Sequence, residues 1–140
     1  MTTVLNGLLG GLLVGVLAAT VTRSVDTEPS AWAARTTDAL GVRTVAARWL
    51  DGATRVAYGG VGGGALVALE LYVLGVLAVP PTVGEAFGMA VAWSALLFAV
   101  RVLFARVGPS PDRSRLVAPL VYHLVYGLGL GVWIRLTWIT

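Results

Sequence analysis

The chain has 140 residues, of which 57% are hydrophobic and 12% are charged, and its mean hydropathy is +0.84. Soluble domains carry about 25% charged residues, so the composition excludes a separate soluble domain and predicts one membrane domain over residues 1–140. The net charge of +3 comes from Arg alone, which in a membrane protein indicates orientation rather than nucleic-acid binding. With no Cys and one His, we expect no thiolate metal site, no haem and no other cofactor.

Four apolar runs predict an all-α integral membrane protein with four transmembrane helices. A spanning helix needs about 20 apolar residues. The runs cover about residues 3–22, 56–79, 83–106 and 116–139, and a polar connection over residues 23–55 joins the first two. Because Pro80 and Pro81 end the second run, we expect the second and third spans to form a tight antiparallel hairpin.

Small residues recur every four positions in the spans, which places them on one helix face and lets another backbone approach closely. The predicted packing positions are Gly7, Gly11 and Gly15 in the first span, Gly59 and Gly63 in the second, Gly84 and Gly88 in the third, and Gly127 and Gly131 in the fourth. The second span also carries Glu70, an acid that is costly in hydrocarbon. We therefore predict that the second span is the packing centre of the bundle.

The connection predicts one or two interfacial amphipathic helices. Residues 26–29 combine a capping residue, an acid and a proline, which is typical of a helix start, and Gly41 predicts a stop. A second helix would end at Gly52 and carry one apolar face, formed by Val42, Val45, Ala46, Trp49 and Leu50. Such a helix usually lies in the headgroup plane, and a docking surface for a partner is the alternative. Asp38 and Asp51 have Arg neighbours, so we expect them to be solvated and not catalytic.

The distribution of Arg predicts the orientation. The first connection contains Arg23, Arg35, Arg43, Arg48 and Arg55, and the third loop with its adjoining helix end contains Arg101, Arg106, Arg113 and Arg115. The second loop and the N-terminus contain none. The positive-inside rule then places both long connections in the cytoplasm and both termini outside.

Polar residues within the spans form a candidate intramembrane site, with members Glu70, His123, Arg101, Tyr58 and Tyr126. Along its helix, Glu70 lies roughly 20 Å from the cytoplasmic end and Arg101 roughly 8 Å, which is too far apart for an easy ion pair. His123 lies roughly 9 Å from the same surface, so it can meet Arg101 or Tyr58 if their helices are adjacent. At the outer side, Glu85 and Arg135 lie at similar depths and form a predicted ion pair.

Several interpretations of these residues stay open. Glu70 is a protonated acid that fixes helix register by hydrogen bonding, a proton or cation relay, or a contact with a partner subunit. His123 is a satisfied residue of the bundle or a ligand. Tyr58 and Tyr126 are expected to be packing groups whose hydroxyls find a partner.

The two halves of the chain resemble each other. Residues 55–59, Arg-Val-Ala-Tyr-Gly, match residues 123–127, His-Leu-Val-Tyr-Gly, and the two halves run in the same direction. This match favours a parallel two-plus-two repeat. Chance similarity between glycine-rich spans is the alternative.

The chain also resembles the YagU-like group of small prokaryotic inner-membrane proteins. The resemblance covers most of the chain and rests on the glycine-rich first span, the Tyr-Gly pair of the second, residues 84–88 (Gly-Glu-Ala-Phe-Gly) and residues 123–129 (His-Leu-Val-Tyr-Gly-Leu-Gly). It implies a four-span fold in the prokaryotic cell membrane and no established activity. Arg55 stands where a second histidine is expected, so the resemblance does not extend to a two-histidine site.

A structural or accessory role is the function that the sequence favours. Glycine faces on all four spans exceed what one bundle requires, so we expect the bilayer, and either the chain itself or another membrane subunit, as partners. The alternative is a small proton- or ion-coupled transporter or channel that uses Glu70 and His123. An enzyme is not predicted, because Ser94 lacks a nearby base and no paired acids share a face. The Arg-rich connection would sit among phosphate headgroups, which keeps a lipid-handling role open.

Overall fold

A computed structural model describes residues 4–26, 28, 30–42, 44–77, 83–107 and 116–138. These residues form five helices, α1 (Val4–Val25), α2 (Ala31–Ala39), α3 (Thr44–Leu77), α4 (Val83–Val107) and α5 (Val117–Trp138). Four of them, all except α2, are long and apolar enough to cross a membrane. The protein is therefore a multi-pass, all-α membrane protein, as the sequence predicts.

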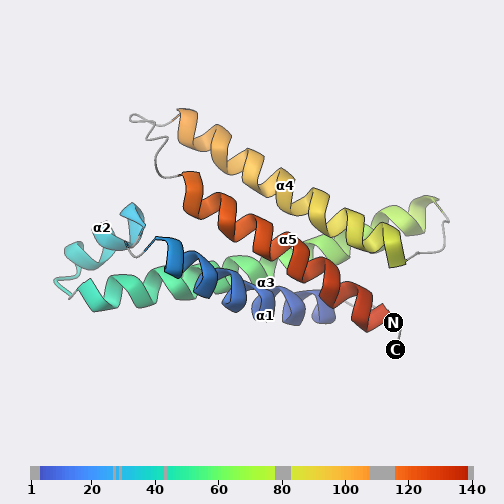
Figure 1. The fold of residues 1–140 in the computed structure, drawn as a ribbon, viewed down its shortest axis with the longest axis horizontal. Coiled ribbons are helices and arrows are strands. Elements are labelled where there is room, and N and C mark those ends of the chain that lie inside the picture. The colour runs from blue at the N-terminus through green and yellow to red at the C-terminus, as the bar shows by residue number, and fades with distance from the viewer. Residues whose placement is uncertain are drawn as a thin grey trace.

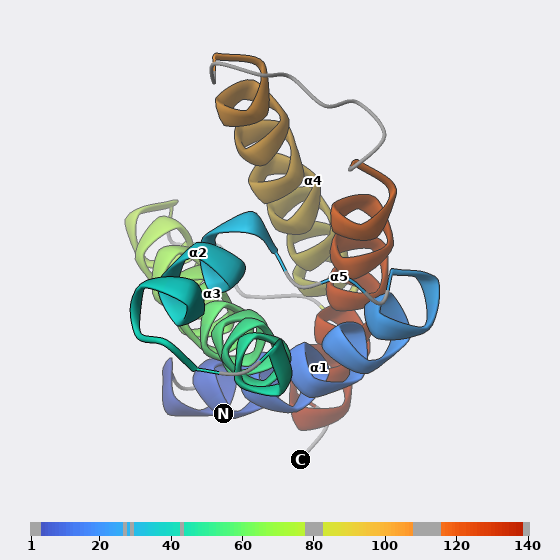
Figure 2. The ribbon, with the colours of Figure 1, turned by 90° about the vertical axis from the view of Figure 1, so that its left-hand side faces the viewer.

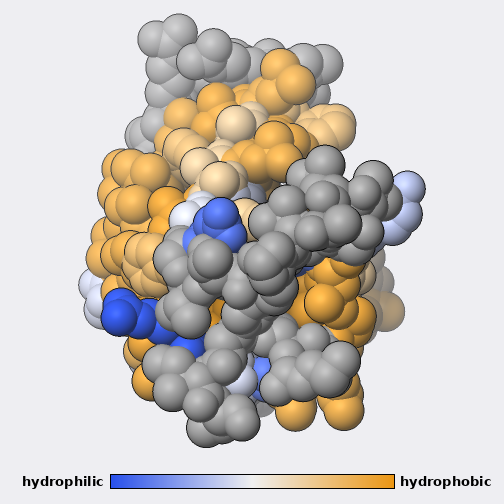
Figure 3. All heavy atoms as spheres, turned by 90° about the vertical axis from the view of Figure 1, so that its right-hand side faces the viewer, coloured by the Kyte–Doolittle hydropathy of each residue, from blue (hydrophilic) through white to orange (hydrophobic). Residues whose placement is uncertain are grey.

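The four long helices form a bundle whose two ends differ (Figure 1). The short helix α2, the last turn of α4 and the first turn of α5 lie at one end, and the start of α1 and the end of α5 lie at the other. At the end with the termini, hydrophobic residues surround the sides of the molecule, with a few hydrophilic residues among them (Figure 3). The helix ends that adjoin the two long connections therefore lie on the same side of the bundle, and the assignment of that side to the cytoplasm stays a prediction.

Helices α1 and α3 run antiparallel along a seam of glycines, which we call the glycine seam: Gly7, Gly11 and Gly15 of α1 against Gly59 and Gly63 of α3. A Cβ atom on Gly59 would lie 2.6 Å from the carbonyl oxygen of Gly11, and one on Gly7 would lie 2.6 Å from that of Gly63. Real Cβ atoms do not approach so closely, so the seam requires glycine at these positions. The face predicted from the spacing of four is thus in contact.

Helix α5 lies between α1 and α4 and supplies much of the core (Figure 1). Every fourth residue on one of its faces is buried, in the series Ala118, Tyr122, Tyr126, Leu130 and Ile134. Equal shares of the α3 and α5 spans, 44%, are buried. The packing centre is therefore shared by α3 and α5, rather than formed by the second span alone.

Helix α4 is the outer helix of the bundle, and it packs on α5 through Gly127 and Gly131. Cβ atoms at these positions would overlap the side chains of Ser94 and Phe87. Helix α4 diverges from α3 (Figure 2) and contacts it far less than it contacts α5. One contact between α3 and α4 is at Gly62, whose carbonyl oxygen accepts a 3.1 Å hydrogen bond from Trp93 Nε1. Helices α3 and α4 run in opposite directions, as the predicted hairpin requires, but they pack together over only a few residues. The tight turn expected at Pro80 and Pro81 lies outside the described residues.

One predicted packing position on α4 has no packing partner among the described residues. Gly88 is exposed, and a Cβ atom there would have nothing within 4 Å among the described residues. The spacing of four places Gly88 and Gly84 on one face, but spacing alone does not say whether a helix of the same chain covers that face. Gly84 lies at the start of α4, and its surroundings lie outside the described part.

The connection between the first two spans contains one separate helix. Helix α2 begins one residue after Ser30, later than residues 26–29 predict, because the Asp26 carboxylate accepts the Glu28 N–H in a turn before the helix. It ends as expected at Gly41, where φ is +66°. The Val42 N–H donates to Thr37 O and the Gly41 N–H to Asp38 O, which is the Schellman arrangement that favours glycine.

The second predicted interfacial helix is the start of α3 and does not end at Gly52. Helix α3 continues for 34 residues, about 50 Å at the α-helical rise, so its first turns extend past the hydrocarbon layer. Gly52 lies under the guanidinium of Arg23, 3.0 Å from the position of a Cβ atom. This glycine makes room for an Arg side chain. Val45 and Trp49, on the predicted apolar face, are exposed, so contact with lipid and docking of a partner both stay open for that face.

The helix pairs agree with the predicted repeat in part. Helix α1 pairs with α3 and α4 with α5, and the later helix of each pair presents glycines to the earlier one. The contact between α1 and α5 has no counterpart of similar extent between α4 and α3. A duplication of the two halves therefore stays a prediction.

Candidate functional site

A cavity of ≈ 130 Å³ lies at the Arg-rich end of the bundle, where α4 has diverged from α3. Residues of three long helices and the residue before α2 line it: Ser30, Asp51, Thr54, Arg55, Tyr58, Arg101, Pro119, Tyr122 and His123. We call this space the polar cavity. It contains three of the five residues predicted for the intramembrane site, namely Tyr58, Arg101 and His123.

His123 is the most fully partnered of these residues. Its side chain is 4% exposed, and its Nδ1 lies 2.7 Å from the carbonyl oxygen of Pro119, one turn earlier on α5. A carbonyl oxygen accepts but cannot donate, so Nδ1 carries a proton. In the neutral ring Nε2 is then an acceptor, and it lies 3.1 Å from the hydroxyl of Tyr58 on α3. The contact between His123 and Tyr58, expected from their depths, is thus present.

Two tyrosines of α5 bridge to backbone carbonyls of α3. The Tyr122 hydroxyl donates to Arg55 O and the Tyr126 hydroxyl to Gly59 O, each at 2.6 Å. Their rings are one helical turn apart and stacked, with centroids separated by 5.9 Å. We call this pair the tyrosine bridge. Tyr126 is therefore a helix-linking residue whose hydroxyl has a partner, as expected.

Ser94 contacts His123 through the backbone. Its hydroxyl donates to the carbonyl oxygen of His123, and it does so from the face of α4 that packs on Gly127. The Ser94 hydroxyl thus holds α4 and α5 together and does not point to the imidazole nitrogens.

The charged residues of the polar cavity are unequally paired. Arg55 Nε lies 2.9 Å from Asp51 Oδ2, and Asp51 Oδ1 accepts a 3.4 Å contact from the Ser30 N–H. Both carboxylate oxygens of Asp51 are therefore engaged. Arg101, by contrast, has no hydrogen-bond or ion-pair partner among the described residues. The cavity consequently carries an excess of positive charge, with two guanidinium groups and one carboxylate in its lining.

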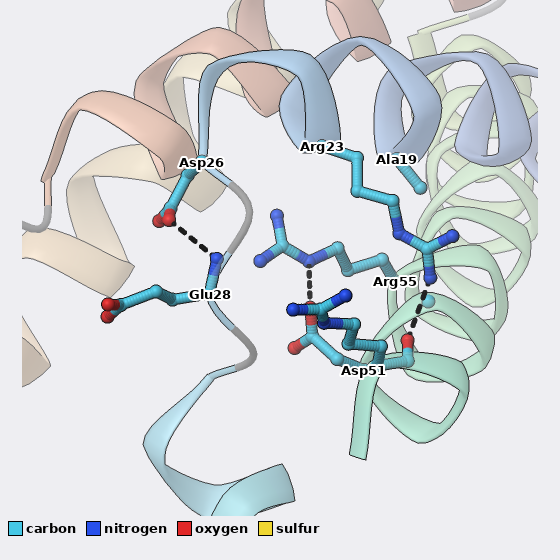
Figure 4. Close-up of a pocket in the computed structure, with 8 residues that line it drawn as sticks. Ala19, Arg23, Asp26, Glu28, Asp51 and Arg55 are labelled. Atoms are coloured by element: carbon cyan, nitrogen blue, oxygen red, sulfur yellow. Dashed lines mark hydrogen bonds and ion pairs between the residues drawn. The ribbon is translucent and has the colours of Figure 1, made fainter. Parts of the chain in front are cut away.

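A smaller polar cluster lies beside this cavity, between the end of α1 and the start of α3 (Figure 4). Arg23 Nη2 donates a 2.8 Å hydrogen bond to the carbonyl oxygen of Arg48. Asp51 and Arg55 point into this cluster as well, so they connect it to the polar cavity. Its volume of ≈ 20 Å³ is close to the about 10–15 Å³ that one water molecule needs. The cluster therefore has room for little beyond solvent.

Glu70 lies apart from the polar cavity. It follows Tyr58 by twelve positions on α3, which places it roughly 18 Å farther along the helix axis. Its side chain is 1% exposed, and within the described residues its Oε2 has no hydrogen-bond partner. The buried apolar side chains of Leu66 and Leu130 belong to the intervening core. Glu70 and His123, which the sequence groups in one site, therefore belong to different regions.

The predicted outer ion pair stays a prediction. Glu85 lies in the first turn of α4, Arg135 lies near the end of α5, and both are exposed at the end of the bundle where α1 begins.

Several residues of the polar cavity were not predicted from the sequence, namely Ser30, Asp51, Thr54, Arg55, Pro119 and Tyr122. Two signals were available. Asp51 and Arg55 are separated by four positions, as are Tyr122 and Tyr126, and such pairs share a helix face. Either pair predicts a residue of the cavity only if α3 continues through Gly52. That continuation places the first turns of α3 beside the start of α5.

Comparison with known proteins adds no relative: no family model, curated protein or solved structure matches the chain. The resemblance to the YagU-like group therefore stays a prediction. Function has to be argued from the described residues themselves.

Proposed function

We propose that the chain is a structural membrane protein that assembles with a second copy of itself through the outward face of α4. One observation carries this proposal. Only 11% of the α4 span is buried, against 33% to 44% of the other three spans. The outward face nevertheless bears a stripe of exposed small residues at helical spacing, formed by Gly88, Ala92, Ala95 and Ala99.

Small residues on a lipid-facing helix favour close approach of another helix. The glycine seam illustrates this effect within the chain, because the same spacing of four on α1 and α3 brings the two backbones into contact. A stripe of this kind is complementary to a copy of itself across a twofold axis, where the same patch serves both subunits. A second copy is therefore the simplest occupant of the α4 face.

Disulfide cross-linking tests the assembly directly, since the natural chain has no Cys. With Ala92→Cys as the single thiol, we expect a covalent dimer in native membranes treated with a membrane-permeable oxidant. Leu13→Cys is the matched control. It is exposed on α1, and it follows the first residue of its helix by nine positions, as Ala92 does on α4. Equal cross-linking of the two variants would reflect random collision and would contradict the proposal.

The mass of the particle extracted in mild detergent separates self-assembly from an accessory role. A mass of two chains agrees with the proposed dimer. A larger complex with a different protein at fixed stoichiometry would instead make the chain an accessory subunit, with α4 as its docking helix. A monomer in native membranes, with no cross-link at Ala92, would remove both forms of the structural role.

A second candidate function is transport of protons or cations through Glu70. The observation in its favour is a carboxyl group that is 1% exposed and whose Oε2 has no hydrogen bond within the described residues. Ionisable residues at such positions often mark ion pathways. If this candidate is correct, proteoliposomes that contain a pH-sensitive dye will show flux that Glu70→Gln abolishes and that Glu85→Gln, at an exposed site, preserves. Equal flux with Glu70→Gln would leave this function without its main residue.

A further inference from the structure

The polar cavity has the chemistry of an anion site, and this follows from its unequal pairing. It contains two guanidinium groups and one carboxylate. The carboxylate of Asp51 is engaged at both oxygens, by Arg55 Nε and by the Ser30 N–H. The Arg101 guanidinium, with five N–H donors, has no partner among the described residues. An anion entering the cavity would therefore meet open donors and would not displace an existing ion pair.

A second polar group lining the cavity also lacks a partner. The Ser30 hydroxyl oxygen is buried and has no hydrogen bond within the described residues, although Ser30 occupies the N-cap position of α2. A serine at this position usually accepts a hydrogen bond from the helix that follows, and here its side chain makes no such bond. Donation by this hydroxyl to a ligand in the cavity would therefore break no existing hydrogen bond among the described residues.

The backbone adds to the positive field. Pro119, in the first turn of α5, lines the cavity together with Ser30, so the N-termini of α5 and α2 both border it. Helix N-termini carry partial positive charge and favour anions. The volume of ≈ 130 Å³ is well above the about 10–15 Å³ needed by one water molecule, so a group the size of a phosphate fits.

The depth of the cavity indicates where the anion comes from. Arg101 precedes the end of α4 by six positions and His123 follows the start of α5 by six positions, which places each roughly 9 Å from its helix end. This depth corresponds to the boundary between hydrocarbon and headgroups. Phosphate is the anion that a membrane presents at that level, and Arg forks match its oxygens.

From these observations we propose that the polar cavity binds a phosphate group, with Arg101 as its principal donor and Arg55 and Ser30 as supporting donors. Asp51 holds Arg55 in place, and the Tyr58–His123 hydrogen bond closes the wall formed by α3 and α5. The phosphate is carried by a lipid headgroup or by a soluble phosphate compound. This binding site is independent of the outward face of α4, because none of its residues lies on the small-residue stripe.

Lipid binding to the purified chain in detergent tests the proposal. Phosphatidylglycerol is titrated and bound lipid is counted by native mass spectrometry, and inorganic phosphate is titrated in parallel as a competitor. We expect Arg101→Gln to weaken phosphatidylglycerol binding at least about tenfold and Ser30→Ala to weaken it less. Arg35→Gln is the matched control, since Arg35 is exposed on α2 at the same end of the bundle but does not line the cavity.

The outcomes distinguish a lipid headgroup from a soluble phosphate compound. They also distinguish binding in the cavity from general attraction to surface charge. Binding that inorganic phosphate does not displace indicates a lipid headgroup, and displacement at millimolar phosphate indicates a soluble ligand. An equal loss in Arg35→Gln and Arg101→Gln would show attraction to surface charge alone and would overturn the cavity as a site. Unchanged binding in Arg101→Gln, with a preserved helical circular dichroism spectrum, would also overturn it. Cross-linking through Ala92→Cys should be unaffected in every case.

Discussion

Helix α3 contacts its two neighbours in opposite ways. Toward α1 its glycines bring backbone against backbone, and Gly59 lies so close that a Cβ atom would sit 2.6 Å from Gly11 O. Toward α5 it is reached by long side chains, and the same Gly59 accepts the hydroxyl of Tyr126 at 2.6 Å. The glycine seam is tightly closed, whereas the tyrosine bridge holds α3 and α5 apart.

This difference explains where the candidate functional residues lie. Backbone contact along the glycine seam leaves no room for a ligand or for polar side chains. The spacing imposed by Tyr122 and Tyr126, together with the divergence of α4, leaves the polar cavity at the Arg-rich end. The close contact of α1 and α3 along the glycine seam therefore suits a structural role. The space that the tyrosine bridge leaves between α3 and α5 suits binding of a ligand.

The largest expected effect comes from filling the glycine seam. In Gly63→Ala the new Cβ atom would overlap Gly7 O and lie 2.9 Å from Gly11 Cα. Since these are backbone atoms that cannot move aside, we expect a loss of about 1–3 kcal/mol in the free energy of unfolding. The measurement is the loss of helical circular dichroism as mixed micelles are titrated with sodium dodecyl sulfate.

The adjacent glycine provides the control for this substitution. In Gly64→Ala the new Cβ atom would lie 3.6 Å from Leu8 Cβ, an ordinary contact. Because Ala is the better helix former, Gly64→Ala should leave stability unchanged or raise it by up to about 1 kcal/mol. Equal losses in both variants would mean that glycine matters for general flexibility of α3 and not for the approach of α1.

The sequence predicts the glycine seam well, because a spacing of four places residues on one helix face whatever the tertiary fold. The same spacing does not predict which helix covers the small-residue face of α4, because it carries no information about the tertiary fold. Gly88 obeys the spacing that applies to Gly11 and Gly63, yet it faces outward. Periodicity identifies a face, and the choice of neighbour depends on how all the helices pack together.

A smaller effect is expected from weakening the tyrosine bridge. Tyr126→Phe keeps the stacked ring and removes the hydroxyl that donates to Gly59 O. Hydrogen bonds between membrane helices contribute about 0.6 kcal/mol on average, so we expect a loss of that order in the same titration. Tyr72→Phe is the control, because Tyr72 is 71% exposed. A loss as large as that of Gly63→Ala would mean that the bridge, and not the seam, holds α3 in the bundle.

The polar cavity was predicted in part. Depth along each helix is enough to bring His123 level with Tyr58 and Arg101, and the structure places all three around one space. The depths place Glu70 far from these three residues, but the sequence still groups it with them because an acid within a membrane span is often functional. The participation of Asp51 and Arg55 was missed because Gly52 was interpreted as a helix end, which assigned both residues to a separate interfacial segment.

The smallest expected effect is that of Gly52→Ala. Farther along α3, Gly59 and Gly63 face backbone atoms of α1, whereas Gly52 faces an Arg side chain. A Cβ atom there would meet Arg23 Nη2 at 3.0 Å, the far end of a flexible side chain that can shift at little cost. Ala is favoured over Gly inside a helix by about 0.5–1 kcal/mol, and displacing the Arg23 guanidinium offsets part of this gain. Gly52→Ala should therefore raise the free energy of unfolding by less than Tyr126→Phe lowers it. A loss comparable to that of Gly63→Ala would instead mean that the hydrogen bond from Arg23 to Arg48 O fixes the guanidinium rigidly. The tight packing of the glycine seam would then extend beyond the membrane, into the polar cluster at the start of α3.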